Sequence, residues 1–293
     1  PSALRKGKEA DFATLVEWQL TVAGCNQLML GFGRAVKQAK VMHMLESGSV
    51  PHQHFIDEEV SSSVLKTLQE KGWIESIECK PEIRDWSRQV EADVDKPKLN
   101  EEQAIAIATV NSFDGFGCFL LEGVTGSGKT EVYLNLIKPV LEKGRQALVL
   151  VPEIGLTPQT INRFRHRFNV PVEVIHSGLN DSERLNAWLS ARDKAAGIVI
   201  GTRSALLTPF AELGIIIVDE EHDASYKQQD SLRYHARDVA VMRANKEQIP
   251  IVLGSATPAL ETLHNALSGK YHHLTLTERA GNAVPTTNKV LDV

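Results

Sequence analysis

The sequence predicts an α/β fold in which helices cover a parallel sheet, preceded by a small α+β module. Three observations favour this fold. Short apolar runs alternate with longer amphipathic segments from about residue 97 onward, a pattern typical of βα units. A glycine-rich phosphate-binding pattern lies between an apolar run and a helical segment. The length of 293 residues allows about two domains.

The first domain is expected over residues 1–80. A strand is predicted within residues 11–21, helices over 33–45 and 61–71, and a strand over 73–77. A helix followed by a glycine and a short strand closes a winged helix, so a winged-helix-like DNA-binding domain is one interpretation. A small α+β module without a DNA role is the other. Residues 81–98 are rich in charge and contain two prolines, so we expect a linker there.

The second domain is expected over residues 99–293. Six buried strands are predicted from its apolar runs, over residues 118–121, 147–151, 172–175, 197–200, 215–218 and 251–253. A helix is predicted over residues 129–141. Asn180, followed three residues later by Glu183, indicates the start of another helix, because this spacing is typical of a capping box.

The composition is that of an ordinary soluble globular protein, with 42% hydrophobic and 24% charged residues. No apolar run approaches the length of a membrane span, so no membrane partner is expected. Cys25, Cys79 and Cys118 lie far apart, which predicts reduced thiols, a cytoplasmic location and no zinc site. The net charge of −5 gives no sign of a nucleic-acid partner. The chain begins with Pro1 instead of Met, so we expect a piece of a longer protein.

The phosphate-binding pattern is the most specific motif of the sequence. It follows a predicted strand and opens a predicted helix, which is the context that a nucleotide-binding P-loop requires. Backbone N–H groups of such a loop face the phosphates, while the lysine contacts the β- and γ-phosphates and the threonine hydroxyl binds Mg²⁺. The expected nucleotide-binding residues are Gly123, Thr125, Gly126, Ser127, Gly128, Lys129 and Thr130.

Two further motifs follow predicted strands. Residues 215–218 end in Asp219, Glu220, Glu221 and His222. If this strand shares a sheet with the P-loop strand, Asp219 joins Thr130 in binding Mg²⁺, and Glu220 orients and deprotonates the attacking water. We therefore expect Glu220, Asp219 and Lys129 to be catalytic. The segment Gly254-Ser-Ala-Thr257 follows residues 251–253, and its hydroxyls are expected to relay the nucleotide state through His222, Ser255 and Thr257.

The three motifs together carry a family resemblance. GVTGSGKT, DEEH and GSAT occur in the order seen in superfamily 2 helicases. The segments VPEIGLTPQT, HSGLNDSER, GTRSAL, DEEHDASYKQQ and RYHARD resemble the bacterial primosomal restart helicases over about residues 97–293. This resemblance implies a RecA-like first motor lobe and an ATP-dependent, 3′-to-5′ DNA helicase that acts in primosome assembly and at stalled forks. It implies ATP and Mg²⁺ as cofactors. Its implied partners are forked and single-stranded DNA, other primosomal proteins and single-stranded DNA-binding protein.

The resemblance also implies roles for residues outside the three motifs. Gln103 would read adenine. An aromatic-rich loop over residues 223–238 would couple DNA binding to hydrolysis. In that loop the family's Trp is replaced by Leu232, which removes a stacking ring. The implied DNA contacts are Pro152, Glu153, Thr202, Arg203, Tyr226, Lys227, Arg233 and Tyr234.

The resemblance assigns no DNA contact within residues 1–80. The family's second motor lobe, which supplies an arginine to the transferring phosphate, would lie outside this chain, as would its zinc-binding cysteines. We therefore expect the fragment to bind ATP and DNA but to lack activity alone. Two other classes share the P-loop. A small-molecule kinase would need an acceptor pocket and a lid, and a nucleic-acid-binding module with a structural P-loop would show no DNA-stimulated turnover.

Overall fold

A computed structural model of the chain describes residues 15–32, 35–46, 48–51, 54–55, 58, 60–79, 86–87, 90, 92, 97–229 and 233–279. The chain divides into two compact units near residue 82. The smaller unit contains the described residues up to Cys79, and the larger unit contains those from Trp86 onward.

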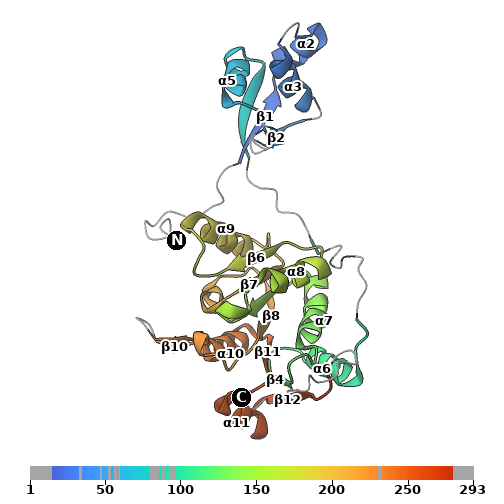
Figure 1. The fold of residues 1–293 in the computed structure, drawn as a ribbon, viewed down its shortest axis with the longest axis vertical. Helices are drawn as coiled ribbons and strands as arrows, with labels where there is room; N and C mark the ends of the chain where they lie inside the picture. The colour runs from blue at the N-terminus through green and yellow to red at the C-terminus, as the bar shows by residue number, and fades with distance from the viewer. Residues whose placement is uncertain are drawn as a thin grey trace, which may run out of the picture. The chain divides into compact units, whose positions relative to one another are not determined.

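The smaller unit is a three-stranded antiparallel sheet with helices packed on it (Figure 1). Its strands, in the order β2-β1-β3, are β1 (Leu15–Leu20), β2 (Val50–Pro51) and β3 (Ile74–Cys79). Its longer helices are α2 (Val22–Leu30), α3 (Val36–Met44) and α5 (Ser62–Glu70). A core that includes Met42, Phe55 and Leu68 joins the helices to the sheet. The predicted strands and the predicted helices around α3 and α5 are confirmed.

Helix α2 was not predicted from the sequence. Its apolar residues are spread around the helix, and Val22, Met29 and Leu30 are exposed. Thr21 caps the helix by accepting a hydrogen bond from the Gly24 N–H. A Cβ at Gly24 would lie 2.0 Å from the Trp73 carbonyl oxygen. Glycine at this position therefore permits the close approach of α2 to the start of β3.

The larger unit is built on a seven-stranded sheet in which every pair is parallel. The strand order is β12-β4-β11-β8-β5-β7-β6. All six predicted strands are confirmed, and the β12 edge strand is an addition. The strands are β4 (Gly117–Gly123), β5 (Gln146–Leu150), β6 (Val172–Ile175), β7 (Ile198–Gly201), β8 (Leu213–Val218), β11 (Pro250–Ser255) and β12 (His272–Leu276).

Helices bury both faces of this sheet. The longer helices are α6 (Glu101–Asn111), α7 (Lys129–Glu142), α8 (Pro158–Arg167), α9 (Asp181–Arg192), α10 (Ala236–Glu247) and α11 (Leu260–Leu267). One core contains residues of α6, α7 and α8 and the other contains residues of α9 and α10. Alternate strand residues enter each core, as Val149 and Leu148 do. In Figure 1, α7 and α10 accordingly lie on opposite sides of the strands.

The boundary between the two units falls within the expected linker over residues 81–98, and the described residues of that stretch pack on the larger unit. Trp86 and Val90 are buried, and both belong to the core that contains α7. The Trp86 indole N–H donates a hydrogen bond of 2.9 Å to the Lys194 carbonyl. The Val90 carbonyl accepts a 2.7 Å hydrogen bond from the Asn169 N–H. The charge and proline content of this stretch indicated a linker. The packing was missed because two buried apolar side chains are too few to produce a periodic pattern.

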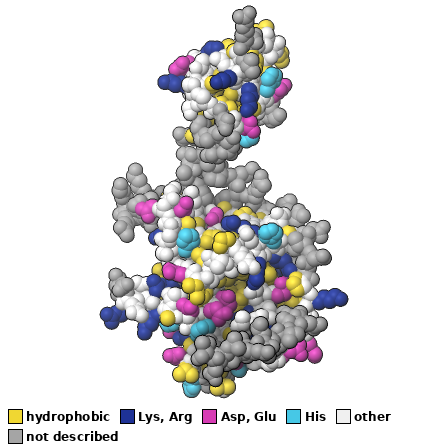
Figure 2. All heavy atoms as spheres, viewed as in Figure 1, with side chains coloured by type: hydrophobic (Ala, Val, Ile, Leu, Met, Phe, Trp, Pro, Cys, Tyr) yellow, Lys and Arg dark blue, Asp and Glu magenta, His cyan; other side chains and the backbone are white. Residues whose placement is uncertain are grey.

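Acidic and basic side chains are interspersed among the described residues on the face shown in Figure 2, so this face carries no broad field of one sign. Among the described residues, no helix is both long and apolar enough to cross a membrane.

Candidate nucleotide site and nucleic-acid interface

The P-loop connects the end of β4 to the start of α7 in a tight turn. Gly126 and Gly128 have φ angles of 82° and 84°, in the left-handed region that favours glycine. A Cβ at Gly123 would lie 2.6 Å from the Ser127 hydroxyl oxygen. The glycines therefore let the loop close around a small volume, and α7 begins at Lys129 with its first N–H groups facing that volume.

Polar groups of the loop fit a polyphosphate. The Lys129 ammonium is nearly buried and donates a 2.7 Å hydrogen bond to the Gly123 carbonyl. It lies 3.9 Å from the Glu220 carboxylate. The Ser127 hydroxyl is buried, and no hydrogen-bond partner for it is found among the described residues. A buried hydroxyl without a partner is costly, and phosphate oxygens are the acceptors that would satisfy it.

A cavity of about 950 Å³ opens over this loop. Asp219 and Glu220 of the acidic motif line it together with the P-loop and Glu131. Helix α8 adds basic side chains to the lining. The lining residues include Lys98, Gln103, Thr125, Gly126, Ser127, Gly128, Lys129, Thr130, Arg163, His166, Arg167, Asp219 and Glu220. The structure therefore gathers the expected nucleotide, metal and base residues, except Gly123, around one volume.

The acidic motif begins where β8 ends. Strand β11 lies between β4 and β8, so the P-loop, the GSAT segment and the acidic motif follow three adjacent strands. Glu220 has a φ of 45°, a left-handed conformation that is strained for a residue with a side chain and is common at functional sites. Burial raises the pKa of Asp219, and a hydrogen bond from Tyr133 acts in the opposite direction.

Two tyrosines hold Asp219, and neither role was predicted. The Tyr133 hydroxyl donates a 2.8 Å hydrogen bond to Asp219 Oδ1, and the Tyr226 hydroxyl donates a 2.7 Å hydrogen bond to the Asp219 carbonyl. Burial and the nearby Asp219 charge raise the pKa of Tyr133 well above its usual value, so this hydroxyl remains a donor. A tyrosine four residues after Lys129 lies on the same face of α7, which is the only sequence signal for Tyr133.

Gln103 is almost fully buried beneath the P-loop. Its side-chain amide donates a 2.9 Å hydrogen bond to the Ser127 carbonyl, and its oxygen accepts a hydrogen bond from the Asn100 N–H. The residue thus closes a capping box at the start of α6 while it braces the loop. It also lines the cavity, so its expected contact with adenine stays a proposal.

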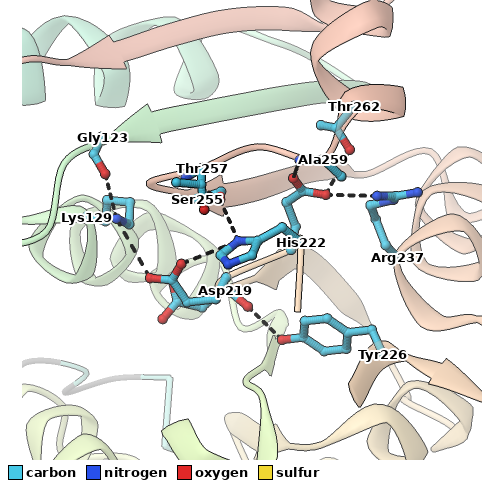
Figure 3. Close-up of polar contacts among 12 residues, drawn as sticks. Gly123, Lys129, Asp219, His222, Tyr226, Arg237, Ser255, Thr257, Ala259 and Thr262 are labelled. Atoms are coloured by element: carbon cyan, nitrogen blue, oxygen red, sulfur yellow. Dashed lines mark hydrogen bonds and ion pairs between the residues drawn. The ribbon is translucent and has the colours of Figure 1, made fainter. Parts of the chain in front are cut away.

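The expected coupling residues meet beside the site. His222 Nδ1 and the Ser255 hydroxyl share a 2.7 Å hydrogen bond (Figure 3). The Ser255 hydroxyl also accepts a 3.0 Å hydrogen bond from the Thr257 N–H. The Thr257 side chain is exposed. The acidic motif and the GSAT segment are therefore joined by the His222–Ser255 contact, while Thr257 takes part through its backbone.

Glu221 is a buried junction that the sequence did not reveal. Its carboxylate is fully buried, and Arg237 at the start of α10 lies 3.1 Å from Oε2. Thr262 in α11 donates a 2.8 Å hydrogen bond to the same oxygen, and the Ala259 N–H donates one of 2.7 Å to Oε1. Figure 3 shows these groups converging on one carboxylate. The acidic motif is thereby tied to the first turns of both α10 and α11.

Comparison with known proteins identifies the family. Residues 100–266, more than half of the chain, match the family described as "DEAD/DEAH box helicase". The chain belongs to the DEAD/DEAH box helicase family. Membership of a helicase family is inconsistent with the small-molecule kinase alternative. The expected RecA-like lobe agrees with the parallel sheet and with the P-loop at the end of its strand β4.

Curated relatives of this DEAD/DEAH box helicase chain are much longer than the chain. "Replication restart protein PriA" of Haemophilus influenzae is 46% identical over 300 residues, covering 100% of the chain and 40% of that relative. The Bacillus subtilis protein of the same name is 42% identical over 268 residues, covering 89% of the chain and 33% of that relative. The solved structure "RecG bound to three-way DNA junction" is 25% identical, with a TM-score of 0.48 over 64% of this chain and 25% of that one.

The helicase residues expected to hold single-stranded DNA differ in accessibility. Pro152 is buried and has no N–H to offer a phosphate, while Glu153 is exposed and carries a like charge. Thr202 is 6% exposed. Arg203 donates hydrogen bonds of 3.1 and 2.8 Å to the Ser225 and Lys227 carbonyls. In the helicase lobe Arg203 thus braces the loop after the acidic motif.

The expectation that Tyr226 contacts DNA is corrected by its burial. The Tyr226 side chain is 0% exposed and belongs to the core that contains α10. Its hydroxyl donates a hydrogen bond to the Asp219 carbonyl, as Figure 3 shows. An aromatic residue in a charged loop suggested base stacking, but the aliphatic core beneath this loop takes up the ring.

The remaining loop candidates of the helicase lie together at the surface. Strands β9 (Lys227–Gln228) and β10 (Tyr234–His235) pair as a short antiparallel hairpin. Lys227, Arg233 and Tyr234 line a shallow groove of about 530 Å³ on this hairpin. Lys227 and Arg233 are exposed and Tyr234 is half-buried. Leu232, where the expected Trp is missing, lies outside the described residues.

Proposed function

We propose that the chain carries the nucleotide-binding motor lobe of an ATP-dependent DNA helicase that acts in replication restart. The observation that carries this proposal is the single cavity lined by the P-loop, Asp219 and Glu220, in a chain of the DEAD/DEAH box helicase family. Its resemblance to relatives named "Replication restart protein PriA" supports the biological role. The chain spans 40% or less of these two relatives, so the activity belongs to the whole protein.

The residues of the cavity support distinct roles in hydrolysis. Thr130 and Asp219 would hold Mg²⁺, which would neutralise charge on the phosphates when bound. Lys129 would give up its contact with the Gly123 carbonyl and place its charge on the β- and γ-phosphates. Glu220, whose carboxylate already faces Lys129 across 3.9 Å, would take the proton of the attacking water. Gln103 would contact the adenine from beneath the loop.

The surface hairpin is the part of the lobe best suited to a DNA strand. Lys227 and Arg233 can meet phosphates, and the Tyr234 ring can stack on a base. We propose forked and single-stranded DNA as the ligand and 3′-to-5′ movement as the polarity, both from the family resemblance. Other primosomal proteins and single-stranded DNA-binding protein are proposed as partners on the same ground.

Phosphate release by the full-length protein, measured with and without forked DNA, tests this function. Turnover should require DNA, and Lys129→Ala should abolish it while leaving the far-UV circular dichroism spectrum unchanged, because the substitution removes the charge that meets the γ-phosphate. Turnover that does not respond to DNA would contradict the helicase proposal. Nucleotide binding without any turnover would favour a binding module with a structural P-loop.

A further inference from the structure

Tyr133 lies where α7 passes beneath the ends of β8 and β11. Its side chain is 1% exposed, and its hydroxyl reaches Asp219 Oδ1 at 2.8 Å. A tyrosine with its hydroxyl buried needs a polar partner, yet a phenylalanine would fill the same core without this requirement. The contact with Asp219 is therefore what distinguishes a tyrosine from a phenylalanine at this position.

The space for this hydroxyl is made by a missing side chain. A Cβ at Gly254 would lie 1.7 Å from the Tyr133 hydroxyl oxygen and 2.9 Å from the ring carbon that bears it. Gly254 follows Leu253, which pairs with Val218 in the sheet, and Asp219 follows Val218. Glycine in the GSAT segment thus leaves a slot next to Asp219, and the tip of Tyr133 occupies it.

The contact orients the carboxylate without cancelling its charge. An arginine or lysine at this place would pair with Asp219 and compete with a bound cation, whereas a phenol donates one hydrogen bond and leaves the negative charge available. Tyr226 holds the Asp219 carbonyl from another direction at 2.7 Å. The backbone and the carboxylate of Asp219 are thereby fixed by different residues.

We propose that Tyr133 is a positioning residue that holds Asp219 in the orientation needed to bind Mg²⁺ together with the nucleotide. This inference rests on the proposed function, since it presumes a nucleotide and a divalent cation in the cavity. Residues that hydrogen-bond to metal ligands typically change metal affinity by roughly 10- to 100-fold when they are replaced. Tyr133→Phe should therefore raise the Mg²⁺ concentration needed for tight nucleotide binding by roughly 10-fold, at the lower end of that range.

Fluorescence titration of the 293-residue chain with a fluorescent ADP analogue measures this effect without any turnover. Binding is followed first in EDTA and then at increasing Mg²⁺. Tyr133→Phe should leave binding in EDTA unchanged and shift the Mg²⁺ midpoint upward. Tyr226→Phe is the matched control, because it removes a buried hydroxyl from the Asp219 backbone and leaves the carboxylate contact in place. Its Mg²⁺ midpoint should shift less than that of Tyr133→Phe.

Equal midpoints for Tyr133→Phe and the unmodified chain would overturn the inference, as would equal shifts for the two Phe variants. If Tyr133→Phe fails to fold, Gly254→Ala takes its place. The added methyl group pushes the Tyr133 hydroxyl away from Asp219, although the tyrosine itself is retained. An unchanged Mg²⁺ midpoint in folded Gly254→Ala would also overturn the inference. Failure of the proposed function looks different: Lys129→Ala and the unmodified chain would bind the analogue equally well.

Discussion

Arg237→Met should destabilise the larger unit, because it leaves a buried carboxylate without its charged partner. The Glu221 side chain is 0% exposed, and Arg237 faces it at 3.1 Å. Removing one member of a buried ion pair costs about 3–5 kcal/mol, since the remaining charge stays in a poorly solvated place. Two neutral donors, the Ala259 N–H and the Thr262 hydroxyl, still serve Glu221 in the variant. We therefore expect a loss of free energy of unfolding near the lower limit, about 3 kcal/mol.

Differential scanning calorimetry of the 293-residue chain measures this loss in the transition of the larger unit. A loss of about 3 kcal/mol corresponds to a decrease in Tm of roughly 6–12 °C for a unit of this size. Asp238→Asn is the matched control, because Asp238 pairs with the same guanidinium but is 65% exposed. An exposed pair contributes about 1 kcal/mol or less, so the control should melt close to the unmodified chain.

A double substitution separates loss of charge from loss of packing. In Arg237→Met combined with Glu221→Gln, the buried side chain is neutral and can still bond to Ala259 and Thr262. The double variant should therefore be more stable than Arg237→Met alone, which is a strongly non-additive result. Strictly additive losses, or a loss of under about 1 kcal/mol for Arg237→Met, would refute the interpretation of Glu221 as a charged junction.

Three further predictions concern catalysis, DNA and the thiols. Glu220→Gln in the full-length protein should retain binding of a fluorescent nucleotide but lose about 10²-fold or more in phosphate release, because the amide cannot accept the proton; parallel loss of binding would exclude Glu220 as the base. Tyr234→Ala should lower DNA-stimulated hydrolysis more than basal hydrolysis, since stacking contributes ~1–3 kcal/mol per base. Equal losses of the two rates would indicate that the Tyr234 ring serves packing instead. Burial raises the pKa of Cys118 to about 12. At pH 8, iodoacetamide should therefore label the exposed Cys25 and leave Cys118 unlabelled until urea unfolds the protein. Peptide mass spectrometry measures which cysteine is labelled.

The raised pKa of Cys118 also predicts in which direction the free energy of unfolding changes at high pH. The folded thiol has a higher pKa than the unfolded one, whose ordinary value is 9.0. Between these values the unfolded state loses its proton while the folded state keeps it, so the unfolded state is favoured as the pH rises. The contribution of Cys118 to stability is thus fully present below pH 9 and is lost as the pH rises toward about 12. A Cys118→Ala variant, which lacks this thiol, should show a smaller decline in the free energy of unfolding over that pH range.

Local sequence patterns were sufficient to predict the strands that are buried on both faces. Ile215 to Val218 form a run that only a central strand accommodates, and the motif after it could be placed at the sheet edge. Strand β12 escaped prediction because its residues, beginning with His272 and His273, are mostly exposed at the sheet edge. The order of the strands, with β11 between β4 and β8, depends on long-range packing that no local pattern encodes.

The loop after the acidic motif shows why residue type alone could not separate ligands from anchors. Its first turn is fixed by the Tyr226 hydroxyl on the Asp219 carbonyl, and its far end is fixed by Arg237 on Glu221. Arg203 holds the carbonyls between them. A DNA strand that displaced the β9–β10 hairpin would therefore pull on Asp219 and Glu221 at once. Tyr226 and Arg203 were expected as DNA ligands because of their residue types, yet their side chains bind the backbone carbonyls of Asp219, Ser225 and Lys227 and so anchor the loop to the end of β8.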